Sequence, residues 1–227
     1  MRLQSLGSKE KARLLLRFFK TGPGEYGEGD IFVGLTVPEI RKLAKEYQGL
    51  ALTETVRLLQ SPLHEARLLA LILLIHAYKK GAPALQAKIY NLYLKNTCYI
   101  NNWDLVDASA EHIVGSYLRN RSRVPLYKLA VAPLLWDRRI AIIATFHFIK
   151  SGEFAETLRI ADTLLKDRED LMHKAVGWML REAGKRDQGA EEEFLKTRYH
   201  IMPRTMLRYA IEKFPEKLRL QYLHGEI

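Results

Sequence analysis

Apolar residues recur three and four positions apart along nearly the whole chain, and strict apolar–polar alternation is almost absent. The first spacing is typical of amphipathic helices and the second of half-buried strands. The pattern therefore predicts an all-α fold. A glycine-rich loop, Thr21 to Gly34, follows the first predicted helix. The predicted helices cover residues 8–20, a segment opening at Thr36, a segment opening at Ser61-Pro62, and residues 84–95, 101–118, 125–132, 137–150, 154–166, 170–184, 188–197, 203–214 and 215–223.

The helix that opens at Thr36 has a strong start signal. Thr36 is a good N-cap residue, Pro38 suits the first turn, and Glu39 occupies the capping-box position. The helix after Ser61-Pro62 carries apolar residues at helical spacing. It is predicted to bury the face made of Leu63, Ala66, Leu69, Ala70 and Leu73.

The predicted helices fall into pairs joined by short turns, with a period of about 35–45 residues. This period is typical of HEAT and armadillo repeats, in which each helix pair buries its apolar face by stacking on its neighbours. We expect residues 1–227 to form a single domain of this kind, a solenoid whose concave face suits a rod-shaped ligand such as a duplex. A globin-like or irregular bundle is the alternative, because the repeats share little sequence.

The chain is basic, with 36 Lys and Arg residues against 26 Asp and Glu residues and a formal net charge of +10. Residues before and after position 100 are both positive overall, so the excess is not confined to a tail. A basic folded body favours a polyanionic partner, since phosphate neutralisation supplies affinity without base recognition. The alternative is a solvated surface that happens to be basic.

Cysteine content and hydropathy indicate the compartment. Cys98 is the single cysteine, which excludes an internal disulfide and a multi-cysteine zinc site and fits a reducing cytoplasm. We expect its side chain to be buried as a small apolar group. The longest apolar run, Leu68 to Ile75, is too short to cross a bilayer, and the N-terminus has no signal-peptide pattern. These features predict a soluble cytoplasmic protein without a membrane partner.

Several chemically suggestive patterns have simpler interpretations. Gly22 to Gly27 matches G-x-G-x-x-G, but it follows a helix rather than a strand and is rich in acidic residues, so we interpret it as a loop. The pairs His64-Glu65 and Glu111-His112 lack metal-site spacing and are predicted to be cap or surface residues, and no metal is expected. The run Glu191 to Glu193 is interpreted as a solvated helix start.

Three segments combine tryptophan with charged residues. In the first, Trp103 and Asp107 stand four residues apart, so they should share one helix face. Asp107 lies beyond the first turn, where aspartate is a poor helix former, and this favours a functional role over a structural one. The second segment is Trp136-Asp137-Arg138-Arg139, where the indole is expected in the core. The third is Lys174 to Glu182.

The third segment contains a mid-helix glycine, Gly177, directly before Trp178. Glycine there costs about 1 kcal/mol relative to alanine, and it allows another backbone to approach closely. We therefore expect this helix to pack tightly against a neighbour at Gly177.

Taken in order, these segments resemble a known family. Phe32 to Lys45 is similar to the N-terminal signature of the AlkD-type DNA alkylation repair glycosylases, which are built from HEAT-like repeats. Trp-Asp-x-Val-Asp at 103–107, Trp-x-x-Arg at 136–139 and Lys-Ala-x-Gly-Trp-x-Leu-Arg-Glu at 174–182 follow in the family's order. The resemblance covers nearly the whole chain.

The resemblance implies roles for particular residues. Trp103 and Trp178 correspond to the family's active-site tryptophans, Asp107 to its catalytic carboxylate, and Arg139 to its phosphate-contacting arginine. Arg138 is a second DNA-binding candidate. Where the family can place a tyrosine near DNA, this chain has Phe18 or Phe19, so a hydroxyl contact is not expected from this helix.

The expected activity is hydrolysis of the N-glycosidic bond of cationic N3- or N7-alkylated purines in duplex DNA, without a cofactor and without base flipping. The partner is double-stranded DNA carrying alkylated bases, and the protein is expected to be a monomer. Two other functions remain open. One is a non-catalytic HEAT-repeat module that binds distorted or branched DNA, and the other is a protein–protein scaffold.

Overall fold

A computed structural model describes residues 2–227, and within that range the secondary structure is helical apart from one isolated parallel bridge between Ile31 and Leu63. The predicted all-α fold class with helical repeats is confirmed. The chain divides into two compact units, the first ending at Ser109 and the second beginning at Ala110. No helix among residues 2–227 is both long and apolar enough to span a membrane.

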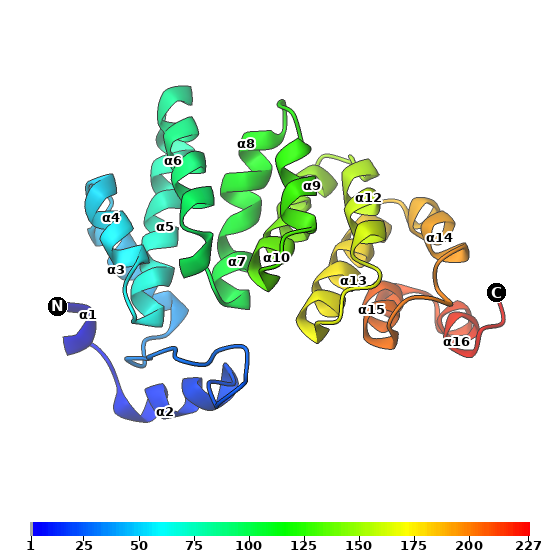
Figure 1. The fold of residues 1–227 in the computed structure, drawn as a ribbon, viewed down its shortest axis with the longest axis horizontal. Coiled ribbons are helices and arrows are strands. Elements are labelled where there is room, and N and C mark those ends of the chain that lie inside the picture. The colour runs from blue at the N-terminus through cyan, green and yellow to red at the C-terminus, as the bar shows by residue number, and fades with distance from the viewer. Residues whose placement is uncertain (1) are drawn as a thin grey trace. The chain divides into compact units, whose positions relative to one another are not determined.

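The first unit begins with α1 (Arg2–Ser5), α2 (Lys9–Phe18) and a long loop, and α2 and the loop lie below the other helices of this unit in Figure 1. The capping box at Thr36 is confirmed, since Glu39 accepts the Thr36 backbone N–H at 2.7 Å. The hydrogen bonds from Thr36 lower the pKa of Glu39 to about 2. The elements are α1 (Arg2–Ser5), α2 (Lys9–Phe18), α3 (Val37–Glu46), α4 (Leu52–Leu59), α5 (His64–Lys80), α6 (Pro83–Lys95), the 3-10 turn Thr97–Tyr99 and α7 (Trp103–Ala110).

Helix α5 forms the centre of the first unit, with α3, α4 and α6 packed around it. Every residue from His64 to Ile75 is buried, so α5 is covered on all sides rather than on the single face that the sequence predicts. Between α2 and α3, Gly34 has φ +87°, and a Cβ at this position would lie 2.7 Å from the Ala12 nitrogen. Glycine therefore lets the loop cross close to α2.

The second unit is a series of packed helices, in which α9 pairs with α10 and α13 packs against α10, α12, α14 and α15. At Gly177 of α13, an added Cβ would lie 2.5 Å from the Tyr209 Cβ, which confirms the predicted close approach. The elements are the π-turn Glu111–Gly115, α8 (Ser116–Leu118), α9 (Val124–Ala130), α10 (Leu135–Ala144), α11 (Phe146–Ile149), α12 (Ala155–Thr163), α13 (Asp170–Gly184), α14 (Gln188–Lys196), α15 (Arg204–Ala210), the 3-10 turn Ile211–Lys213 and α16 (Glu216–His224).

Three local expectations are wrong. Cys98 is exposed, because it lies in a short 3-10 turn rather than on a packed helix face. His64, Glu65 and Glu111, which the sequence predicts at caps or on the surface, are buried, with 2%, 1% and 8% of their surface exposed. Glu191 is 1% exposed because α14 turns this residue toward α13, so the predicted solvated run holds only for its neighbours. Trp136, 5% exposed, is a core residue as expected.

Candidate active site

Helix α7 carries two of the predicted site residues. Trp103 is its first residue and Asp107 lies one turn later, and both are partly buried. The regular α-helix over Trp103–Ala110 places them on one face, as the spacing predicts. The helix start is fixed by Asn102, whose side-chain oxygen accepts the Trp103 backbone N–H at 2.8 Å.

The Trp103 indole belongs to an aromatic cluster. It stacks on Phe19 with ring centroids 5.4 Å apart and meets Phe18 edge-on at 5.9 Å. Phe19 also stacks on Phe32 at 5.0 Å. Phe19 is buried, whereas 63% of Phe18 is exposed. Of the two phenylalanines that the sequence offers near the DNA, Phe18 is therefore the one accessible to a ligand. Phe19 is buried and packs against the Trp103 ring.

A buried polar network, which no sequence pattern predicts, lies next to this cluster. The His64 Nδ1 lies 2.9 Å from an Asp30 oxygen, and its Nε2 lies 2.8 Å from an Asp104 oxygen. The Phe32 ring stacks on the imidazole at 4.5 Å. Burial by itself lowers the pKa of His64, but the hydrogen bonds to Asp104 and Asp30 outweigh it and raise the pKa above 6.5.

Asp30 is the acidic centre of the network. Its Oδ1 accepts from Arg67 at 2.5 Å. The Asn102 amide donates at 2.9 Å to Oδ2, the oxygen that faces His64. Burial by itself raises the pKa of Asp30, but the His64 hydrogen bond and the charge of Arg67 outweigh it and lower the pKa below 3.8. The loop that contains Asp30 is thus bound to both α5 and the start of α7.

Glu65, the next residue of α5, fixes the loop further along. Its carboxylate accepts three successive backbone N–H groups, those of Val33 at 3.1 Å, Gly34 at 2.8 Å and Leu35 at 3.2 Å. A buried carboxylate with several charge-assisted hydrogen bonds is well compensated for its desolvation. The only sequence signal for His64 and Glu65 is their position in the first turn of α5.

The second unit holds the predicted arginines on α10. Arg139 is 5% exposed and donates from Nη1 to the Leu171 carbonyl at 2.6 Å, which connects α10 to α13. Arg138 donates to both Asp167 oxygens, at 2.6 Å from Nε and 3.4 Å from Nη2. It also donates to the Ala132 and Pro133 carbonyls. Both guanidinium groups are thus held in place by the protein.

Trp178 lies on α13 and is partly buried, with its ring 6.0 Å from that of Phe146. The preceding Gly177 lets α13 pack close to α15. The predicted site residues are therefore divided between the two units: Trp103 and Asp107 in the first, and Arg138, Arg139 and Trp178 in the second. Their combination in one active site remains a prediction.

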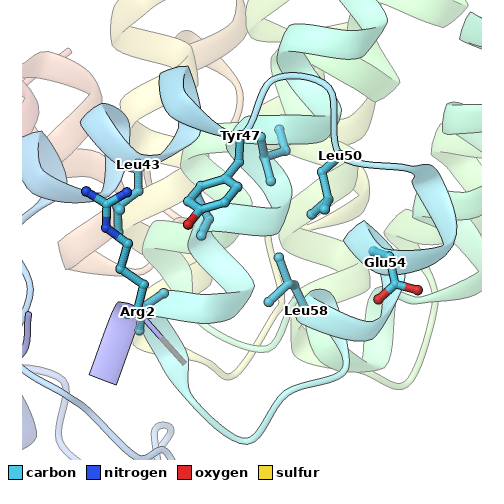
Figure 2. Close-up of a pocket in the computed structure, with 9 residues that line it drawn as sticks. Arg2, Leu43, Tyr47, Leu50, Glu54 and Leu58 are labelled. Carbon is cyan, nitrogen blue, oxygen red and sulfur yellow. The ribbon is translucent and has the colours of Figure 1, made fainter. Parts of the chain in front are cut away.

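An apolar cavity of about 240 Å³ occupies a different part of the first unit. Figure 2 shows Tyr47, Leu43 and Leu58 around it, with Arg2 and Glu54 at its edges. It lies among α1, α3, α4 and α5, and none of the predicted site residues lines it. The cavity therefore does not contribute to the candidate site.

Comparison with known proteins agrees with this description. Residues 1–214 match a protein family described as "DNA alkylation repair enzyme". A solved structure named "Predicted DNA alkylation repair enzyme from Enterococcus faecalis" superposes with a TM-score of 0.70 at 18% sequence identity. The match covers 92% of this chain and 97% of that chain, and at this identity it shows the fold alone. No curated protein sequence matches the chain.

Proposed function

Because this chain belongs to the DNA alkylation repair enzyme family, we propose that it is a monofunctional DNA glycosylase. Its substrates are cationic N3- or N7-alkylated purines in duplex DNA, and the reaction leaves an abasic site. The family shows a role in the repair of alkylated DNA. The observation that supports the finer proposal is the presence of Trp103 and Asp107 on one face of α7 in a protein of net charge +10.

The chemistry explains why a single carboxylate suffices. An alkylated purine that is already cationic leaves as a neutral base, so the reaction needs little help from a general acid. Positive charge develops instead on the sugar, which becomes oxocarbenium-like in the transition state. We propose that Asp107 stabilises this charge and orients the attacking water, as carboxylates do in glycoside hydrolysis.

The two tryptophans would bind the damaged nucleotide through their ring faces. The negative face of an indole attracts positive charge, and a flat ring can contact the deoxyribose without reading the base. Trp103 is supported by Phe19 and partly exposed, which suits a contact surface. This mode of recognition senses charge and sugar, so the damaged base could stay stacked in the duplex.

Arg139 is proposed to contact a DNA phosphate and fix the register of the backbone, with Arg138 as a second DNA-binding residue. Both guanidinium groups are already oriented, Arg139 by the Leu171 carbonyl and Arg138 by Asp167. An oriented arginine loses less conformational entropy on binding than a free one. We further propose that the protein is a monomer that acts on cytoplasmic DNA without a cofactor. Its helical repeats would form a single domain with a concave DNA-binding face.

Release of 7-methylguanine from methylated duplex DNA tests the proposal. Asp107→Asn should slow release by about 100-fold or more, because it removes the charge that stabilises the transition state. The matched control is Asp162→Asn, a surface carboxylate on α12 paired with Arg198. Equal rates for wild type and Asp107→Asn would refute the assigned role.

The same assay separates the alternative function. Salt-dependent binding to duplex DNA without release of any base would support the non-catalytic module that recognises distorted or branched DNA. Its charge and fold are the same, but it requires no carboxylate at Asp107.

A further inference from the structure

The His64 imidazole lies between two carboxylates that come from different parts of the first unit. Asp30 belongs to the loop before α3, and Asp104 belongs to the first turn of α7. Each ring nitrogen lies within 3 Å of a carboxylate oxygen. An ionised carboxylate only accepts hydrogen bonds, whereas a neutral imidazole carries one N–H and one lone pair. The two contacts are both satisfied only when both nitrogens carry a proton.

The charged groups around the imidazole balance one another. Asp30 from the loop and Asp104 from α7 are negative, and Arg67 on α5 pairs with Asp30. Glu65 directs its charge to the loop amides instead. The two rings that pack against the imidazole, Phe19 and Phe32, are uncharged. An imidazolium gives this group two positive and two negative charges in a site where an unpaired charge would be costly.

We propose that His64 is a positioning residue: as an imidazolium it fastens the start of α7 to the loop before α3, and so sets where Trp103 and Asp107 lie. Asp104 directly follows Trp103 and precedes Asp107 by less than one turn. Asn102, which caps Trp103, also donates to Asp30. A displacement of about 1 Å at a catalytic group can cost about 100-fold in rate. The activity part of this inference rests on the proposed function.

The network also predicts a pH dependence. The pKa of His64 is raised in the folded protein, so the stabilising contribution is complete below 6.5 and is lost as pH rises through the folded pKa. Above that pKa the neutral ring presents a lone pair to one carboxylate. We therefore expect the start of α7 to loosen, and base release to slow, on the alkaline side.

Asp104→Asn should allow the His64 imidazole to be neutral. The Asn amide can donate to Nε2, so a neutral ring that donates from Nδ1 to Asp30 keeps both contacts. The second oxygen of Asp104 is buried and has no hydrogen-bond partner among the described residues, so the substitution breaks no other bond at that atom.

NMR on the full chain with ¹⁵N-labelled histidine tests the charge state without any assay of activity. In a pH titration, His64 in wild type and in the Asp162→Asn control should lose its second ring proton above the ordinary pKa of 6.5, and Asp104→Asn should lose it at a lower pH than wild type. Loss of the second ring proton at or below pH 6.5 in wild type would overturn the proposal.

The positioning role is tested by the Trp103 indole N–H signal and by kinetics. His64→Gln has its donors on a single nitrogen, whereas the imidazolium donates from two nitrogens on different sides of the ring. The variant should therefore shift the Trp103 signal and lower kcat at least tenfold with little change in KM. Asp162→Asn should do neither. If His64→Gln folds and leaves the Trp103 signal and kcat unchanged, His64 does not position α7. If instead no variant, wild type included, releases base while the NMR results hold, the glycosylase proposal fails and the attachment of α7 by His64 stands.

Discussion

The buried carboxyl group of Glu191, in the second unit, predicts a pH-dependent folding stability that can be measured without a substrate. The residue is 1% exposed, and its carboxyl group lies against α13, where a side chain at Gly184 would collide with it. Within residues 2–227, its Oε1 has no hydrogen-bond partner. Burial, together with the charge of Glu192, raises the pKa of Glu191 to about 9, although Arg181 opposes the shift.

The effect on stability follows from the difference between the folded and unfolded states. Because the folded pKa of about 9 lies above the ordinary value of 4.5, the folded state binds the extra proton between these limits. The contribution of Glu191 to folding stability is therefore greatest below pH 4.5 and falls as pH rises toward 9. One proton changes the unfolding equilibrium about tenfold per pH unit, so the loss between pH 4.5 and pH 7 is at most about 3 kcal/mol.

Glu191→Gln should remove this loss, because the amide stays neutral at every pH. Urea unfolding at pH 5, 7 and 8.5 measures the free energy of unfolding of each variant. The gain over wild type should be small at pH 5 and grow with pH. Glu193→Gln, an exposed carboxylate on the same helix, is the control and should show no such trend. If the two variants respond to pH in the same way, Glu191 is ionised in the folded protein and the reasoning is wrong.

Two further substitutions test packing and loop attachment. Gly177→Ala should lower the free energy of unfolding by about 1–3 kcal/mol, because the new methyl group would press against α15. In the same urea titration Gly49→Ala, which has open space around it, should have little effect. Glu65→Gln should destabilise the protein by roughly 1–3 kcal/mol, since charge-assisted bonds to the loop become neutral ones. Hydrogen exchange at Gly34 and Leu35 should then quicken relative to Leu43 on α3, and unchanged exchange would contradict the role given to Glu65.

Local signals in the sequence account for most of the helices. The capping box at Thr36 is signalled by Thr36, Pro38 and Glu39, and the close approach of another helix at Gly177 is signalled by the glycine itself. The structure confirms both. The break of the predicted 137–150 helix at Thr145 has no such signal.

The buried network could not be predicted in this way. The partners of His64 lie 34 and 40 residues away in sequence, so no spacing rule connects them. The family resemblance identifies Trp103 and Asp107 but gives no sign of what holds their helix. A polar pair at the start of a helix, such as His64 and Glu65, is expected to face solvent. In this protein the first three turns of α5 are buried on all sides, so the pair is buried too.

The three amides held by Glu65 form a small anion receptor. Successive backbone N–H groups around a left-handed glycine, here Gly34 at φ +87°, make the concave nest that binds phosphate in other proteins. In this chain the anion comes from the protein itself, so the receptor is already occupied and closed to solvent phosphate. Glu65→Ala would leave the three amides open to inorganic anions. They lie a few residues after Gly22–Gly27, the segment that matches a phosphate-binding motif in sequence only.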